Sequence, residues 1–176
     1  MTVLRRKTET MKIGRKSHGV VVGYDGSAHS AAAVRWAARE AGLRNVPLSI
    51  CHAWEPYMTA GAMTMPVADL SAAAKETLAE GTEVAQGYRD VHAVLESGGA
   101  ASVLMSAGRS AELLVVGSRG RGGFAGVELG SVALQLAAHA PCPVIVVRER
   151  PETSLEHRIR RRQRLGGILN EYENAA

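Results

Sequence analysis

Short runs of apolar, often β-branched residues alternate along the chain with longer, alanine-rich segments. The runs Gly19-Val-Val-Val-Gly23 and Glu112-Leu-Leu-Val-Val-Gly117 are almost wholly apolar. Strands that are buried on both faces of a sheet have this pattern, whereas strands with one solvated face alternate apolar and polar residues. Further strands are expected over residues 48–54, 91–96 and 143–148, and helices over 28–43, 69–88, 100–108 and 131–140. We expect Asp69 to cap the second of these helices. The alternation predicts one α/β domain on a parallel sheet, with helices on both faces.

The net charge of +4, with a pI near 9.4, is concentrated at the two ends of the 176 residues. Residues 1–17 carry six basic side chains against one acidic, residues 18–148 nine against eleven, and residues 149–176 six against five. We therefore expect a flexible basic arm over 1–17, the domain over 18–148 and an arginine-rich tail over 149–176. Because the domain itself is mildly acidic, it is not expected to bind nucleic acid, and that reading stays open only for the basic termini.

Several features of the chain bear on its compartment. Its two cysteines, Cys51 and Cys142, form no paired motif, and the basic N-terminal segment has no apolar stretch of the kind that signal peptides contain. The longest stretch without a charged residue, 129–147, is broken by Pro141-Cys-Pro143, so no membrane span is expected. The expected compartment is the cytoplasm.

In the tail, apolar residues are spaced loosely as in an amphipathic helix, which Gly166-Gly167 would interrupt.

A glycine-rich segment, residues 117–131, lies between an expected strand and an expected helix. It reads Gly117-Ser-Arg-Gly120-Arg-Gly-Gly-Phe-Ala-Gly-Val-Glu-Leu-Gly130-Ser131. Glycine lets backbone N–H groups approach an anion, and the helix that follows adds free N–H groups and its positive dipole end. A phosphate group is therefore the expected ligand, and a flexible surface loop is the alternative. The candidate residues are Gly117, Ser118, Arg119, Gly120, Arg121, Gly122, Gly123, Gly130, Ser131 and Val132.

Two common phosphate-binding motifs do not fit this segment. The P-loop requires a Gly-Lys-Ser/Thr sequence, but residues 117–131 contain no lysine. The dinucleotide-binding spacing GxGxxG fails because Gly120-Arg-Gly122 is followed, three positions on, by Ala125. The spacing is instead Gly117-x2-Gly120-x9-Gly130-Ser131.

This spacing, together with Gly23-Tyr-Asp-Gly-Ser27 after the first strand and Cys51-His-Ala-Trp54 at the end of the second, resembles the ATP-binding branch of the universal stress protein family. The resemblance covers roughly residues 18–148. It implies a Rossmann-like fold with a five-stranded parallel sheet in the order 3-2-1-4-5, and ATP, with or without Mg²⁺, at the carboxyl ends of strands one, two and four. The family commonly dimerises, and the last strand, from Pro143 to Arg148, offers an edge for a homodimer.

The resemblance also implies roles for single residues. Asp25, in the motif that begins at Gly23, would accept hydrogen bonds from the ribose hydroxyls, and the backbone of Ala53 would contact the adenine. Gly117 and Gly120 would let the chain pass close to the ribose and the α-phosphate. Gly130, Ser131 and Val132 would hold the β- and γ-phosphates.

Structural readings of the same residues stay open. Asp25 and Ser27 could cap the first helix, which is the favoured reading for Ser27, and Ala53 could be ordinary strand packing. Arg119 and Arg121 could neutralise phosphate or form a solvated face of the loop. Glu128 is an unfavourable neighbour for a phosphate unless it points away.

Catalysis finds little support in the sequence. It contains no HExxH, no paired-cysteine metal spacing and no GxSxG, and its six histidines are scattered. The leading hypothesis is therefore an ATP-binding regulatory protein of the stress-response type, not an enzyme, with little or no turnover. The alternative is an adenine-nucleotide-dependent transferase or slow ATPase of the same α/β class. A third hypothesis has the basic ends bind nucleic acid or acidic lipid.

Overall fold

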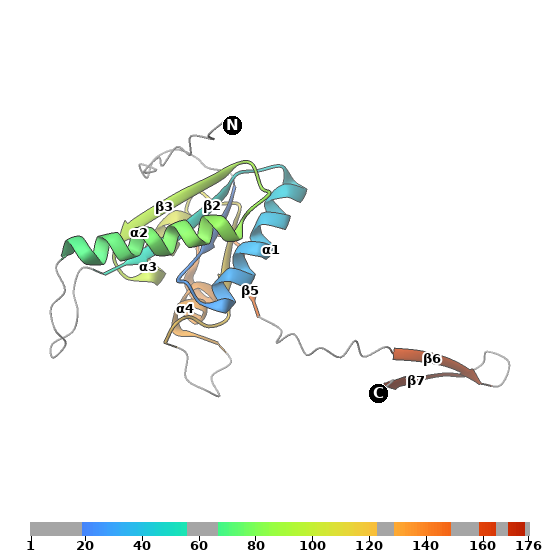
Figure 1. Cartoon of the computed structure of the whole chain (residues 1–176). Helices are drawn as coiled ribbons and strands as arrows, with labels where there is room; N and C mark the ends of the chain where they lie inside the picture. Colours follow the sequence, from blue (N-terminus) through green and yellow to red (C-terminus); the bar gives the residue numbers. More distant parts are fainter. Residues whose placement is uncertain (1–18, 56–66, 123–128, 149–158, 165–168, 175–176) are drawn as a thin grey trace.

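The protein is built on five parallel strands that pair in the order β3-β2-β1-β4-β5 (Figure 1). The computed structural model describes residues 19–55, 67–122, 129–148, 159–164 and 169–174. The strands are β1 (Val20–Gly23), β2 (Leu48–Trp54), β3 (Val91–Ser97), β4 (Leu113–Gly117) and β5 (Val144–Val147). The parallel sheet and the strand order 3-2-1-4-5 are thus confirmed.

In the described part of the chain, four helices cover the sheet, two on each face. They are α1 (Ala28–Arg44), α2 (Val67–Val84), α3 (Ala100–Gly108) and α4 (Ser131–His139). One apolar cluster joins α1 and α2 to residues such as Val20, Val22 and Ile50, and a second joins α3 and α4 to Val21 and Leu114. Neighbouring strand residues therefore face opposite clusters, which explains why β1 and β4 are apolar throughout.

The strand order reverses between β1 and β4. From β1 the chain builds outward to β2 and β3, and it then crosses back to place β4 against the other side of β1. The loops that leave the carboxyl ends of β1 and β4 run to opposite faces of the sheet, to α1 and towards α4 respectively. Open α/β sheets bind ligands in the crevice that this arrangement leaves.

The second helix differs from its sequence prediction at both ends. It begins at Val67, so Asp69 lies within its first turn and is not its cap. At that position the carboxylate is still favourable, because it lies near the positive end of the helix dipole. The helix ends at Val84 and not at residue 88, and Gly87 beyond it has a φ of +97°. That left-handed conformation cannot continue an α-helix.

The amphipathic helix that apolar spacing suggested for the tail is not what residues 159–164 and 169–174 form. They form an antiparallel pair, β6 (Ile159–Arg164) and β7 (Leu169–Asn174). The register sets Arg160 opposite Glu173 and Arg162 opposite Glu171. Residues 1–17, expected as a flexible arm, lie outside the described residues.

No helix within the described part of the chain is both long and apolar enough to cross a membrane.

Candidate nucleotide site

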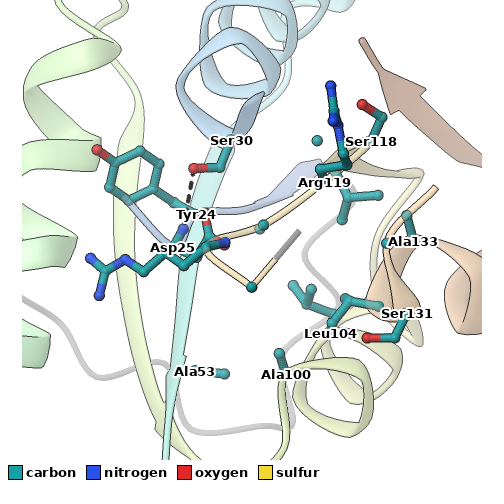
Figure 2. A pocket seen from close by; sticks show the side chains of 18 of the residues that line it. Tyr24, Asp25, Ser30, Ala53, Ala100, Leu104, Ser118, Arg119, Ser131 and Ala133 are labelled. Carbon is teal, nitrogen blue, oxygen red and sulfur yellow. Dashed lines mark hydrogen bonds between the residues drawn. The ribbon is translucent and has the colours of Figure 1, made fainter. Parts of the chain in front are cut away.

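A cavity of about 580 Å³ opens at the carboxyl edge of the sheet, between β1, β2, β4 and the first turns of α3 and α4 (Figure 2). Its volume is within the range of small-molecule sites. The residues that line it and were predicted from the sequence are Gly23, Asp25, Ala53, Gly117, Ser118, Arg119, Gly120, Arg121, Gly122, Gly130, Ser131 and Val132. Gly123 and Glu128 lie outside the described residues. The structure thus brings the described candidates together, and their role as nucleotide ligands stays a prediction.

Other lining residues were not predicted as site residues. They are Tyr24, Ser30, Cys51, His52, Ala100, Leu104, Val116 and Ala133. Tyr24 and Ser30 adjoin the Asp25 motif, but Ala100 and Leu104 belong to a helix whose sequence is unremarkable. Only the sheet topology, which starts α3 at the same edge as the glycine-rich loop, could have pointed to them.

The turn between β1 and α1 is held by a hydrogen-bonded set of three polar residues. Ser27 is the N-cap of α1, and its Oγ accepts a hydrogen bond of 3.2 Å from the Ser30 backbone N–H. Its own hydroxyl and backbone N–H donate to Asp25 Oδ1 at 2.6 and 3.0 Å. The backbone N–H of Asp25 in turn donates to Ser30 Oγ at 3.3 Å, the dashed line in Figure 2. The capping role expected for Ser27 is confirmed.

The second oxygen of Asp25 reaches across to the glycine-rich loop. Asp25 Oδ2 accepts a hydrogen bond of 3.0 Å from the Arg121 backbone N–H, which is 96 residues away in sequence. Partial burial alone would raise the pKa of this carboxyl, but the hydrogen bonds from Ser27, Ser30 and Arg121 outweigh it and leave the pKa below the ordinary value. Asp25 is therefore a carboxylate at neutral pH that ties two loops of the site together.

The beginning of the glycine-rich loop is packed tightly against its neighbours. A Cβ at Gly117 would lie 2.7 Å from the carbonyl carbon of His29 and 2.9 Å from the backbone nitrogen of Ser30, closer than side chains approach backbone. A Cβ at Gly120 would lie 2.5 Å from Asp25 Oδ2. Gly117 is therefore required by the fold, whatever the cavity binds, whereas a side chain at Gly120 would have to displace the Asp25 carboxylate.

The end of the same loop is open. α4 begins at Ser131 with Gly130 as N-cap, and none of the described side chains caps its first turn. Gly130 has an ordinary φ of −70°, and a Cβ there would meet nothing closer than 3.5 Å. The Gly130 backbone N–H donates to the Ser118 carbonyl oxygen at 2.7 Å, which fixes where the loop rejoins the sheet. The first N–H groups of an uncapped helix are a ready site for an anion.

The two arginines of the loop are placed differently. The Arg121 guanidinium does not turn to the open end of the loop: its Nη2 donates to Thr77 Oγ1 of α2 at 3.3 Å. Arg119 is also a lining residue of the cavity, and in Figure 2 its side chain extends away from Ser131. Neither arginine therefore directs its guanidinium to the start of α4 in this structure.

The remaining part of the cavity is mostly apolar. Ala53 from β2 and Ala100 and Leu104 from α3 lie on this side in Figure 2. Burial raises the pKa of the neighbouring Cys51 thiol to about 12, so the sulfur is protonated and a poor nucleophile. A planar, weakly polar group suits such walls, and an anion suits the opposite, glycine-lined end.

Residues 17–148 match the sequence profile of the universal stress protein family. The chain belongs to this family. A universal stress protein of Mycolicibacterium smegmatis is 34% identical over 140 residues, which are 74% of this chain and 48% of that protein. One from Mycobacterium tuberculosis strain H37Rv is 34% identical over 152 residues, 79% of this chain and 50% of that protein. This universal stress protein therefore spans about half the length of the curated relatives that it matches.

Solved structures agree with the fold. A universal stress protein crystallised in complex with cAMP is 30% identical, with a TM-score of 0.60 over 76% of this chain and 98% of that chain. A universal stress protein from Archaeoglobus fulgidus is 25% identical, with a TM-score of 0.58 over 74% of this chain and 98% of the other. The family predicted from the glycine spacing and the Rossmann-like α/β fold are both confirmed.

Proposed function

We propose that this universal stress protein binds an adenine nucleotide, ATP first of all, in the cavity at the carboxyl edge of its sheet. The observation that carries the proposal is the start of α4. Gly130 is needed neither for its backbone angles nor for packing, and the helix behind it begins without a side-chain cap. A phosphate bound there would account for both, since it needs close backbone approach and free N–H groups.

The rest of the cavity supports the same ligand. The apolar walls at Ala53, Ala100 and Leu104 suit an adenine ring, and the carboxylate of Asp25 between the two ends suits ribose hydroxyls. Among the described residues, Asp25 Oδ2 accepts one hydrogen bond, from the Arg121 backbone N–H, so it can accept another. The relative that was crystallised with cAMP, at 30% identity, supports an adenine nucleotide as the class of ligand.

We propose a regulatory role with little turnover, in which the bound nucleotide stabilises one conformation. Asp25 is the acidic side chain that lines the cavity, and its lowered pKa makes it a weak general base at neutral pH. Both of its oxygens are already used to hold the loops. Efficient activation of a water or hydroxyl by Asp25 is therefore not expected.

Titration calorimetry on the full chain tests the proposal. ATP is titrated with and without Mg²⁺, and AMP, cAMP and GTP are titrated under the same conditions. We expect saturable binding of the adenine nucleotides and weaker binding of GTP. Absence of binding at about millimolar ATP, an affinity so weak that it amounts to only about 4 kcal/mol, would overturn the proposal. Analysis of the recovered nucleotide by chromatography measures turnover.

We also propose a homodimer that pairs through β5. This strand is at one end of the sheet order, and its four residues, Val144–Val147, are all apolar and half-buried. An uncharged apolar edge strand tends to acquire a partner. Light scattering after gel filtration should give twice the mass of one chain, and Ile145→Lys should shift it towards one.

A further inference from the structure

Arg121 contacts two other parts of the fold, the β1–α1 turn and α2. Its backbone N–H donates to Asp25 Oδ2 at 3.0 Å, and its guanidinium Nη2 donates to Thr77 Oγ1 at 3.3 Å. Between these two bonds the guanidinium lies over Gly26, where a Cβ would collide with it. Gly26 has a φ of +83°, which also favours glycine. One residue of the glycine-rich loop is thus bound to the β1–α1 turn and to α2.

The partner on α2 is not itself part of the cavity lining. Thr77 is 8% exposed and does not line the cavity, and it belongs to the helix pair on the α1 and α2 face of the sheet. An arginine that served the phosphates would direct its guanidinium to the start of α4, at the opposite end of the loop. Within the described residues, the Arg119 guanidinium has no hydrogen-bond or ion-pair partner, so it is free to turn towards a phosphate.

We propose that Arg121 is a positioning residue that holds the glycine-rich loop against Asp25 by bonding α2 through Thr77, so that α2 and the nucleotide cavity are coupled. The inference rests on the proposed nucleotide binding. On this proposal, Arg121 affects ligand binding by fixing the shape of the loop, and not by the charge of its guanidinium. The loss of the Thr77 bond should therefore weaken every ligand that uses the cavity, whether or not it carries phosphate.

Binding measurements on variants separate positioning from phosphate contact. Thr77→Val removes the hydroxyl acceptor and keeps the shape, Arg121→Ala removes the guanidinium, and Thr82→Val is the matched control on α2, because the Thr82 hydroxyl bonds only the Ala79 carbonyl oxygen. ATP is compared with adenosine, which has no phosphate. We expect Thr77→Val to weaken both ligands by the same factor, about threefold to tenfold. Arg121→Ala should do the same, and the double variant should be no weaker than Arg121→Ala alone.

Two results would overturn the inference. In the first, Arg121→Ala weakens ATP but not adenosine while Thr77→Val has no effect, which would make Arg121 a phosphate ligand. In the second, neither variant changes either affinity by more than Thr82→Val does.

Failure of the proposed function is recognised separately, because the unaltered chain would then bind neither ATP nor adenosine. In that event amide hydrogen exchange decides the coupling. Thr77→Val should accelerate exchange of the Arg121 amide, whose bond to Asp25 it loosens, and Thr82→Val should not. Equal exchange in the three proteins would overturn the coupling.

Discussion

The two ends of the glycine-rich loop contain glycine for different reasons. At the first end, Gly117 lies so close to the backbone of His29 and Ser30 that no side chain fits. At the second end, Gly130 has an ordinary conformation, and a Cβ there would make only ordinary contacts, at 3.5 Å or more. The first glycine is explained by the packing of β4 against α1. The second is not explained by packing or by backbone angles in the described part of the chain, and the proposed nucleotide would explain it.

The difference continues into the helices beside each end. α1 begins with Ser27, whose hydroxyl accepts from the Ser30 N–H, so its first turn is capped by the protein. α4 begins with Gly130 and has no side-chain cap, and its last turn ends at an exposed His139. Among the described residues, a side chain therefore caps the start of α1 and none caps the start of α4, where the proposed nucleotide would place its phosphates.

Replacement of Gly117 by alanine should show the largest effect on stability. The new Cβ would press on backbone atoms at 2.7 to 2.9 Å, and backbone yields less readily than a flexible side chain. We expect a loss of about 1–3 kcal/mol in the free energy of unfolding, measured by urea denaturation. Gly122→Ala is the control, because a Cβ there meets nothing within 4 Å. Equal losses in the two variants would remove the distinction between the packed and the open glycines.

Replacement of Gly130 should affect binding and not stability. In Gly130→Asp, the carboxylate would cap α4 and occupy the place proposed for phosphate, so ATP affinity should fall by about tenfold or more, about 1.4 kcal/mol. The free energy of unfolding should stay the same or rise by a few tenths of a kcal/mol. Gly130→Ala separates charge from bulk and should weaken ATP less than Gly130→Asp does. A loss of stability as large as that of Gly117→Ala would mean that Gly130 is packed as tightly as Gly117.

The sequence predicted both Gly117 and Gly130 as residues of the site, but it could not show that the two glycines are there for different reasons. Continuous apolar runs were enough to predict the strands and a parallel sheet, and glycine spacing was enough to predict the phosphate loop, because both are local patterns. The strand order 3-2-1-4-5 and the place of Ala53 in the site came from the family resemblance. The steric role of Gly117 depends on its contact with α1, which is distant in sequence. The contribution of α3 to the cavity depends in the same way on tertiary structure, because α3 starts at the same edge of the sheet as the loop. The bond from Arg121 to Thr77 depends on how α2 lies on the sheet, which no local pattern encodes.

Local pattern also misled at two places. Asp69 has the residue type of a helix cap, but the preceding residues Val67 and Ala68 already belong to α2. The apolar spacing of the tail favoured a helix, yet residues 159–164 pair with 169–174 across the glycine pair that the helical pattern could not accommodate. In both cases the pairing or packing of longer segments outweighed the preference of single residues.

The capped start of α1 gives a smaller, more local test. Ser27→Ala removes the side-chain cap of the helix and one of the hydrogen bonds to Asp25 Oδ1. We expect a loss of about 1 kcal/mol in the free energy of unfolding. Ser102→Ala, at an exposed position of α3, is the control and should be nearly neutral. If Ser27→Ala were equally neutral, the capped and uncapped helix starts would not differ in energy as their geometry implies.

The smallest effect concerns the acidity of Asp25, which links the packed end of the loop to the β1–α1 turn. Hydrogen bonds that outweigh its burial lower its pKa below the ordinary 3.8, so the folded state favours the charged form more than the unfolded state does. Its stabilising contribution should therefore be complete above about pH 5 and decline as the pH falls through 4 towards 3. Unfolding free energies of the unaltered chain and of Asp25→Asn, measured from pH 7 to pH 3, should differ by a constant amount above pH 5. Below it the difference should shrink, because protonated Asp25 and asparagine no longer differ in charge. A gap that widens on acidification would mean that burial dominates and that Asp25 resists ionisation, in which case it could not hold the loop as a carboxylate.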